Sequence, residues 1–147
     1  SGQQVAVLYF DLDGFKQIND TLGHDVGDLL LVEFAQRVSA VVRQTDTVCR
    51  QGGDEFIALL PALEDPEQAC VVARKILAIC AQALQVQERR LQVGVSGGIA
   101  WFPQHGETID ELARQADAAM YVAKRAGRMQ FRLCGALGEE PQHVSCL

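Results

Sequence analysis

Two adjacent glycines, Gly52 and Gly53, separate two short apolar segments and are followed at once by two acidic residues. The apolar segments, residues 48–50 and 56–60, have the composition of short strands. A Gly-Gly pair between such segments predicts a tight hairpin, because its central residues need a positive φ that glycine adopts freely. We therefore expect Asp54 at the tip of this hairpin and Glu55 at the start of its second strand.

A second pair of acidic residues follows an apolar segment near the N-terminus. Residues 5–10 predict a buried strand that runs directly into Asp11 and Asp13, and strand alternation places both carboxylates on one face. If this strand lies beside the hairpin, Asp11 and Asp13 meet the two hairpin carboxylates at one edge of a sheet. Cations must neutralise such a cluster, and Mg²⁺ prefers one or two carboxylates completed by substrate phosphates and water. The pattern predicts a metal-dependent phosphoryl-transfer site.

The alternative is that these acidic residues are solvated loop carboxylates, the usual state of Asp and Glu at turns. For Asp11 and Asp13 alone, that interpretation is favoured. Their combination with the Gly-Gly-Asp-Glu-Phe turn, and with the Lys16 and Asn19 that follow, favours the phosphoryl-transfer site instead.

Composition favours a single domain. The chain has 147 residues, 48% of them hydrophobic, which is enough to bury a substantial core. No linker-like segment divides it, so we expect one domain over residues 3–134 and a flexible tail or the start of a linker over residues 135–147. Ser1-Gly2 is interpreted as a cloning remnant. A net charge of −6 argues against a general nucleic-acid surface.

Several features favour a cytoplasmic protein. No apolar run approaches the length of a membrane span, and the start lacks the pattern of a signal peptide, so we expect no membrane contact by this chain. Five cysteines without paired metal-ligand spacing favour reduced thiols over disulfides or zinc.

The remaining pattern predicts helices mixed with hairpin-joined strands. We expect helices at about residues 26–42, 66–83 and 109–126. We also expect a strand pair ending near Trp101 and a last strand at about residues 129–133. This order predicts one layered α/β domain of the α+β type.

Four blocks of the sequence, in this order, resemble the GGDEF family, the diguanylate cyclases that condense two GTP molecules into cyclic di-GMP. The blocks span nearly the whole chain and are residues 10–20, 23–28, 52–56 and 116–128. The resemblance implies a central, mostly antiparallel sheet flanked by helices and related to the palm of polymerases and nucleotidyl cyclases.

By this resemblance, Asp11 and Asp54 bind the catalytic Mg²⁺, or Mn²⁺ in its place, and the backbone near Leu12 assists. Metal there would polarise the α-phosphate and neutralise the leaving pyrophosphate. Two roles stay open for Glu55, which either helps to deprotonate the attacking 3′-hydroxyl or binds metal. Asp13 is interpreted as a structural acid.

The resemblance also predicts contacts to the phosphates. Gly52 and Gly53 let main-chain groups approach them. Lys16, Lys124 and Arg128 supply the positive charge that a triphosphate needs. Lys124 and Arg128 are spaced one helical turn apart, which is consistent with a shared side that faces the phosphates, although cations at a helix end are often only partners of its dipole.

Asn19 and Asp28 are the candidates for contacts to the guanine base. A carboxylate can accept from the donor-rich edge of guanine, while an amide can donate to its carbonyl, and the resemblance assigns both positions to the base. The alternative is that Asn19 is a turn residue and Asp28 only an acid near the front of a helix.

Arg43 and Asp46 match the Arg-x-x-Asp inhibitory motif that binds the product, cyclic di-GMP, in this family. Arg74 on the next helix is a candidate second arginine. The alternative interpretation of Arg43 and Asp46 is a surface ion pair of little energy.

The family reaction requires two domains, because each GTP supplies the 3′-hydroxyl that attacks the other, so we expect a homodimer for catalysis. The chain begins at the first core strand, which predicts a piece excised from a larger sensory or GGDEF-EAL protein and a weakly active or inactive isolated domain. A non-catalytic module that binds GTP or cyclic di-GMP and controls an attached domain is the alternative function. An adenylyl-cyclase-like or polymerase-like palm domain is a third, which the guanine and signature blocks do not support.

Overall fold

The computed structural model describes residues 4–135 and 142–144. Its helices are α1 Phe15–Leu22, α2 His24–Val41, α3 Glu67–Ala81 and α4 Ile109–Arg125. Its strands are β1 Gln4–Asp13, β2 Thr47–Gly52, β3 Glu55–Leu63, β4 Leu84–Val86, β5 Arg89–Leu91, β6 Gly94–Phe102, β7 Gln130–Leu133 and β8 Gln142–His143.

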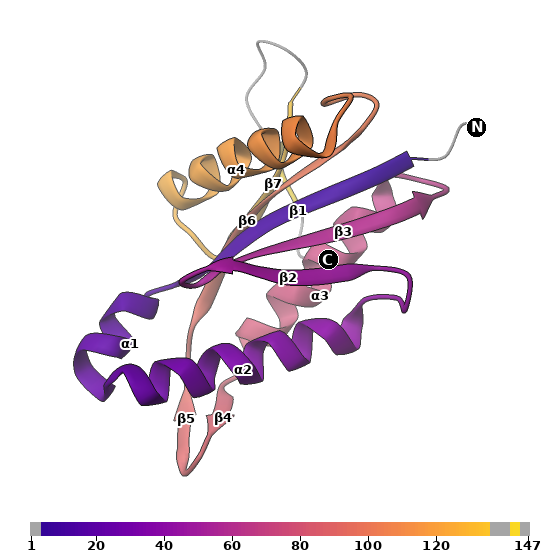
Figure 1. Ribbon diagram of the computed structural model, residues 1–147. Coiled ribbons are helices and arrows are strands. Elements are labelled where there is room, and N and C mark those ends of the chain that lie inside the picture. The colour runs from indigo at the N-terminus through magenta and orange to yellow at the C-terminus, as the bar shows by residue number, and fades with distance from the viewer. Residues whose placement is uncertain (1–3, 136–141, 145–147) are drawn as a thin grey trace.

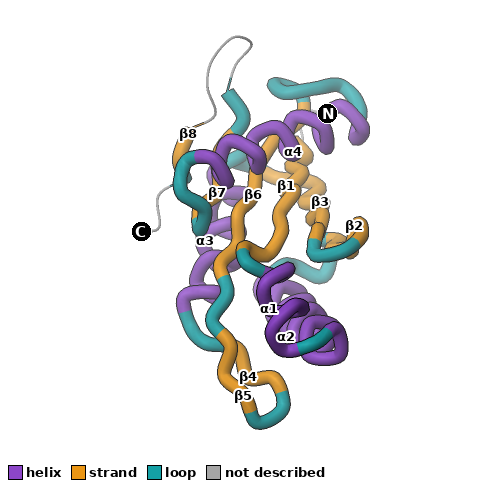
Figure 2. The backbone as a smooth tube through the Cα atoms, turned by 90° about the vertical axis from the view of Figure 1, so that its left-hand side faces the viewer, coloured by secondary structure: helices purple, strands orange, loops and turns teal. Residues whose placement is uncertain are grey.

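A mixed sheet forms the centre of the fold. Its strand order is β2-β3-β1-β6-β7-β8, with β6 and β7 parallel and the other neighbours antiparallel. Figure 1 shows α4 on one side of this sheet and α2 and α3 on the other. The short hairpin of β4 and β5 forms a separate two-stranded sheet that extends away from it, as Figure 2 shows. The predicted α+β class is confirmed.

Two elements differ from the sequence prediction. The first is α1, which was not predicted, although Phe15, Ile18 and Leu22 have the spacing of one helix face. The second is the strand pair expected to end near Trp101. In the structure, β4 and β5 pair with each other, and the strand that contains Trp101 is a third one, β6, which pairs with β1 instead.

Part of the predicted tail pairs with the sheet. Residues of β8 pair with β7, and the following Val144 is buried, with 4% of its surface exposed. The domain boundary near residue 134 stays a prediction, since residues 136–141 and 145–147, including Cys146, lie outside the described residues. Ser1-Gly2 also lies outside them.

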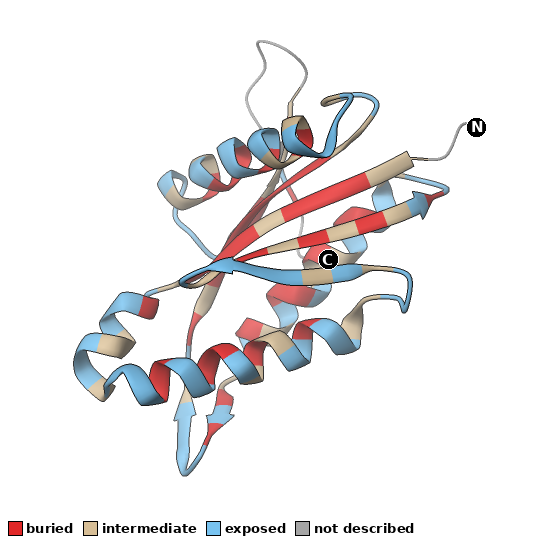
Figure 3. Cartoon of the chain, in the orientation of Figure 1, coloured by how far each residue is buried: buried red, intermediate tan, exposed pale blue. Residues whose placement is uncertain are grey.

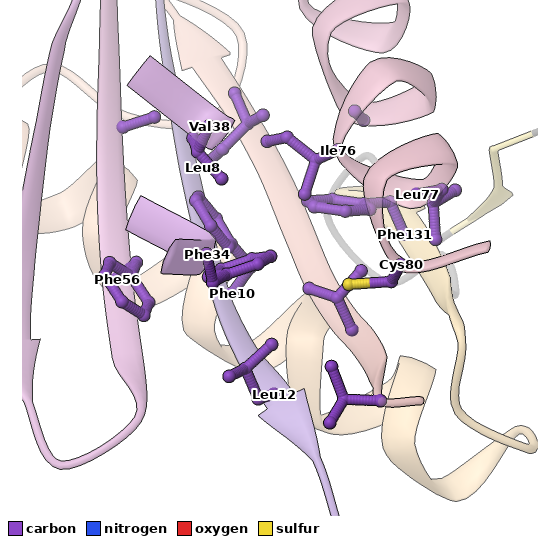
Figure 4. Packing of buried hydrophobic residues seen from close by; sticks show 14 of the residues in the cluster. Leu8, Phe10, Leu12, Phe34, Val38, Phe56, Ile76, Leu77, Cys80 and Phe131 are labelled. Atoms are coloured by element: carbon purple, nitrogen blue, oxygen red, sulfur yellow. The ribbon is translucent and has the colours of Figure 1, made fainter. Parts of the chain in front are cut away.

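The larger core lies between the sheet and the helices α2 and α3. Alternate residues of β1 point into it, among them Leu8, Phe10 and Leu12. Phe10 contacts the rings of Phe34 and Phe56, at centroid distances of 6.1 and 5.8 Å. Figure 4 shows this packing, and Figure 3 shows that β1 is buried along most of its length. The strand that ends in Asp11 and Asp13 is therefore held rigidly by apolar packing on both sides.

The opposite face of β1 and β6 packs against α4. Val7 and Ala100 form a smaller core with Leu112 and Ala116 of the helix. The approach is close at Gly98, where a Cβ would lie 2.0 Å from the backbone oxygen of Ala116. This contact fixes the distance of α4 from the sheet, and with it the position of every side chain that α4 carries toward the ends of β1 and β3.

The loop after β6 contains a half-buried histidine, His105, whose protonation makes the stability of the domain depend on pH. His105 Nδ1 accepts a hydrogen bond from the backbone N–H of Trp101 at 3.0 Å, and the two rings lie 4.8 Å apart. Burial lowers the pKa of His105 below its usual value of 6.5. The native state therefore binds this proton less tightly than the unfolded state, so stability falls as the pH falls below about 6.5.

We expect His105→Asn to reduce this loss of stability at acidic pH. Urea unfolding of the wild type and the variant between about pH 7 and pH 5 measures it, with the single Trp101 as the fluorescent probe. His143→Asn is the matched control, because His143 is exposed. An unchanged pH dependence in His105→Asn would contradict the assignment.

Candidate functional site

The hairpin turn between β2 and β3 carries two of the predicted acids. Gly52 pairs with Glu55, so the two central residues of the turn are Gly53 and Asp54 rather than the two glycines that the sequence suggested. Gly53 has a φ of 51°, a conformation that glycine adopts without a side-chain clash. Asp54 thus lies at the tip of the hairpin and Glu55 begins β3, as predicted.

Asp11 lies opposite Glu55 in the register of β1 and β3. Asp11 is only 5% exposed, and its Oδ2 pairs with Nζ of Lys124 in α4 at 2.5 Å. Its other oxygen, Oδ1, is buried without a hydrogen-bond partner. Burial raises the pKa of Asp11 to about 6, Lys124 opposes this shift, and the charge of Asp54 adds to it. The structure thus places Asp54 close enough to Asp11 to act on its proton affinity.

These acids fit a hard divalent cation as a pair of ligands. The unpartnered Oδ1 of Asp11 is a buried acceptor that a cation would satisfy, and Asp54 supplies a second carboxylate nearby. Within the described residues, no three His, Cys, Asp or Glu side chains are grouped closely enough to hold an ion by themselves. Mg²⁺ commonly binds through one or two carboxylates plus substrate phosphates, so such a cage is not required.

Asp13 has a structural environment. Its carboxylate accepts hydrogen bonds from Ser96 Oγ at 2.7 and 3.0 Å and from the backbone N–H of Met129 at 2.9 Å. These bonds connect β1 to β6 and to the turn after α4. The interpretation of Asp13 as a structural acid agrees with this arrangement, and the backbone partner Met129 could not be found from the sequence.

One hollow, here called the phosphate hollow, opens between the end of β1, α1 and the end of α4. It has a volume of about 470 Å³, and its lining residues are Leu12, Asp13, Gly14, Phe15, Lys16, Gln17, Asp20, Asp54, Lys124 and Arg128. The three predicted cations therefore share one hollow with Asp54.

The reason given for pairing Lys124 with Arg128 was wrong. The helix α4 ends at Arg125, and Arg128 lies in the following turn with a φ of 64°. Its backbone N–H bonds to the oxygen of Ala123 at 3.0 Å. It is this turn, and not a shared helix face, that brings Arg128 to the hollow.

A second hollow, here called the Glu55 hollow, lies on the α4 side of β1 and β3. Its volume is about 650 Å³, and its lining residues are Asp11, Glu55, Arg114, Asp117, Ala118, Met120, Tyr121 and Lys124. Lys124 lines both hollows, while Asp11 lines only this one. Arg114 was not a candidate in the sequence; the signal that could have found it is its spacing of seven residues, about two helical turns, from Tyr121 of the fourth resembling block.

The two candidate base-binding residues come from neighbouring helices. Asn19 lies within α1, not in a turn, and its Oδ1 is buried without a partner. That oxygen points at Gly27, where a Cβ would lie 1.8 Å from it. Asp28 is the next residue of α2 and lines a hollow of about 230 Å³ between α2 and β2. The packing of α1 on Gly27 therefore brings Asn19 next to Asp28.

Arg43 and Asp46 form a compact ion pair before β2. Arg43 donates to Asp46 Oδ1 at 2.7 Å and to the backbone oxygen of Pro61 at 2.6 Å. The hydrogen bond to Asp46 raises the pKa of Arg43. Arg74 does not join them, since it pairs with Glu67 at 3.0 Å. Lys75, which the sequence did not suggest, lines the hollow of about 190 Å³ that Arg43 and Asp46 share.

Comparison with protein families finds a match to the model described as diguanylate cyclase, GGDEF domain, over residues 1–130. Among curated proteins, the bifunctional diguanylate cyclase/cyclic di-GMP phosphodiesterase MucR of Pseudomonas aeruginosa is 48% identical over 86% of this chain. The diguanylate cyclase TpbB of the same species is 41% identical over 89% of it. The chain spans only 18% of the length of MucR and 30% of that of TpbB.

Solved structures agree with this match. The GGDEF domain of TpbB superposes with a TM-score of 0.88 at 40% identity, covering 90% of this chain and 83% of that one. The GGDEF domain of DgcB from Caulobacter crescentus, solved in complex with cyclic di-GMP, gives a TM-score of 0.81 at 28% identity over 90% of this chain and 79% of that one. No helix in the described part of the chain has the length and apolarity needed to cross a membrane.

Proposed function

Because the chain belongs to the GGDEF family, we propose that it is a diguanylate cyclase domain, which joins two GTP molecules into cyclic di-GMP and releases two pyrophosphates in the cytoplasm. The observation that carries the proposal is the buried Asp11, with one unpartnered oxygen, beside an intact Gly-Gly-Asp-Glu-Phe turn. A bound cation would satisfy that buried oxygen, and Asp54 at the hairpin tip supplies a second carboxylate for it.

Asp11 and Asp54 are the proposed ligands of Mg²⁺, with the backbone near Leu12 assisting and with Mn²⁺ as an alternative ion. When bound, the ions of a two-metal site polarise the α-phosphate and offset the charge of the leaving pyrophosphate. Lys124 moves from Asp11 to the triphosphate when the nucleotide enters, since it lines the phosphate hollow as well. The ion pair with Lys124 thus holds Asp11 in place before substrate binds.

The reaction balances over two equivalent steps. In each, a 3′-hydroxyl oxygen of one GTP forms a bond to the α-phosphorus of the other, and the bond from that phosphorus to the oxygen bridging to the β-phosphate breaks. Pyrophosphate leaves with its electron pair, and the hydroxyl proton passes to Glu55 or to water. Since each domain binds one GTP, two copies must face each other across a two-fold axis. We propose that a larger protein supplies this pairing.

Substrate selection would combine the phosphate hollow with Asn19 and Asp28, which come from α1 and α2. Asn19 and Asp28 would bind the guanine edge, because an amide and a carboxylate match its acceptor and donors. Lys16, Lys124 and Arg128 would neutralise the triphosphate, whose phosphates the backbone at Gly52 and Gly53 can approach closely. Arg43 and Asp46, with Arg74 as a second arginine, are the proposed site for product feedback. For that role, Arg43 must exchange its bond to Pro61 for one to the product.

The proposal predicts that this chain, fused to a dimerising coiled coil, produces cyclic di-GMP from GTP and Mg²⁺. Asp54→Ala in the same fusion should lower the rate by about 1000-fold, because charge at the reacting phosphate loses its stabilisation. Chromatography of the nucleotides measures both. Arg90→Ala is the control, since Arg90 is exposed on the β4–β5 hairpin.

A folded, dimeric fusion that binds GTP but forms no product would overturn the cyclase proposal. The regulatory module would then be the better interpretation, with GTP or cyclic di-GMP controlling an attached domain, for example a phosphodiesterase of the EAL type.

A further inference from the structure

The outer face of α4 carries a stripe of residues that the proposed reaction does not yet use. Arg114, Ala118 and Tyr121 follow one another at intervals of four and three residues, so they lie on the same side of the helix. Tyr121 is 60% exposed, the most of any large hydrophobic side chain in the described residues. The guanidinium of Arg125 lies over its ring at 5.8 Å from the centroid. The stripe borders the Glu55 hollow.

The two hollows adjoin at Lys124 of α4. Lys124 lines both of them, while the phosphate hollow has Asp54 and the Glu55 hollow has Asp11 with Glu55. In phosphoryl transfer, the attacking and the leaving oxygens are roughly in line with the phosphorus between them. If the leaving pyrophosphate occupies the phosphate hollow with its three cations, the nucleophile must approach from the opposite direction. The Glu55 hollow, which adjoins the phosphate hollow at Lys124, is the candidate for that approach.

The charges of the Glu55 hollow suit a sugar better than a triphosphate. The carboxylates of Asp11, Glu55 and Asp117 outnumber the two cations, Arg114 and Lys124. Such a mixture repels a polyanion but offers both donors and acceptors to hydroxyl groups, which can donate and accept. The exposed ring of Tyr121 adds an apolar surface of the kind on which a sugar packs.

We propose that the Glu55 hollow receives the ribose of the GTP carried by a second copy of this chain. Tyr121 packs against the sugar, Arg114 donates to its hydroxyls, and Glu55 accepts from the attacking 3′-hydroxyl. The Tyr9 hydroxyl, 3.5 Å from Glu55 Oε1, lies on the sheet side of that carboxylate. This inference rests on the proposed cyclase function and adds to it a site completed only by the partner's substrate.

The first test separates turnover from binding of the domain's own nucleotide. In the coiled-coil fusion, we expect Tyr121→Ala and Arg114→Ala each to lower the rate at saturating GTP by about tenfold or more. Calorimetry on the unfused chain, with a GTP analogue that has methylene between the α- and β-phosphorus, should give a Kd within about twofold of wild type. Ala118→Gln, which fills the hollow without adding charge, should act in the same way. Arg90→Ala is the charge-matched control.

A mixed dimer gives the sharper test. When one protomer carries Asp54→Ala, attack succeeds only at the α-phosphate of the other, and the product is the linear dinucleotide. Tyr121→Ala in the Asp54-containing protomer should lower its formation about tenfold. The same substitution in the Asp54→Ala protomer serves as the comparison, because no productive attack occurs in that hollow, and it should leave the rate within about twofold.

The outcomes distinguish the two proposals. Suppose that the wild-type homodimer makes cyclic di-GMP, but Tyr121→Ala lowers the rate of linear dinucleotide formation equally in both placements, or in neither. The proposed ribose site is then wrong, and the cyclase proposal stands. If the analogue Kd rises as much as the rate falls, Tyr121 and Arg114 belong to the domain's own nucleotide site and the inference is likewise wrong. If the wild-type homodimer makes no product, the cyclase function itself fails.

Discussion

Replacing Asp11 with asparagine should remove nearly all cyclase activity and at the same time stabilise the metal-free domain at neutral pH. The loss of turnover in the dimerised fusion should be about 1000-fold, because the carboxylate charge that a bound cation needs is gone while the shape is kept. The gain in stability should follow from burial, since the Asp11 side chain is only 7% exposed and its ionised form is disfavoured there.

The pH dependence of this gain has a definite sign. The pKa of Asp11 is raised from 3.8 to about 6, so the native state holds the proton more tightly than the unfolded state. Stability contributed by the protonated form is complete below about pH 4 and is lost as the pH rises to about 6. A shift of about two units corresponds to about 3 kcal/mol, the upper limit for the gain of Asp11→Asn at pH 7. Loss of the partner of Lys124 reduces it.

Asp13→Asn is the matched control, two positions along the same face of β1. Asp13 accepts hydrogen bonds from two donors, the Ser96 hydroxyl and the backbone N–H of Met129, so its replacement should destabilise the domain, by about 1–3 kcal/mol. Urea unfolding in the presence of EDTA, repeated from about pH 4 to pH 8, measures both variants against wild type. A less stable Asp11→Asn variant at pH 7, or one that still makes cyclic di-GMP at the wild-type rate, would contradict this account of the site.

Gly98→Ala should be among the most destabilising single-methyl changes in the chain. The added Cβ would lie 2.0 Å from Ala116 O and 2.6 Å from Met120 N, both backbone atoms of α4. No side-chain rotation relieves contacts with backbone, so the whole helix must move away from β6. We expect a loss of about 3 kcal/mol in the free energy of unfolding, which lowers the Tm by about 10 °C.

Activity should fall in Gly98→Ala as well, because α4 carries Lys124 to Asp11. Ala100→Gly is the control on the same strand and the same face of the sheet. It removes a buried methyl group without displacing the helix, so we expect a smaller loss of about 1 kcal/mol. Calorimetric melting and the cyclic di-GMP assay test both variants. Equal Tm values for Gly98→Ala and wild type would mean that α4 is not held at the sheet by this contact.

The site itself was predictable to different degrees at different residues. Asp54 and Glu55 follow a glycine turn between apolar segments, and Asp11 ends an apolar strand, so their places at strand ends follow from local pattern. The pairing of Asp11 with Lys124 does not, because the two residues come from β1 and α4, which only the packing of the helix on the sheet brings together. Arg128 shows the same limit, since a helix spacing was used to place it beside Lys124, whereas the turn after α4 brings it to the phosphate hollow.

The sequence by itself determined the order of the charged residues along the chain. A strand ends in two acidic residues, a glycine hairpin carries two further acidic residues, and basic residues lie in the last helix and after it. Alternation and turn composition encode these features within a few residues, where the backbone alone dictates the result. The tertiary structure alone decided which groups meet. Burial of Asp11, the bond of Asp13 to the backbone of Met129, and the division of the site into two hollows depend on contacts between distant segments. Those contacts form because Gly98 lets α4 approach β6 closely and because apolar packing holds β1 between two layers of helices.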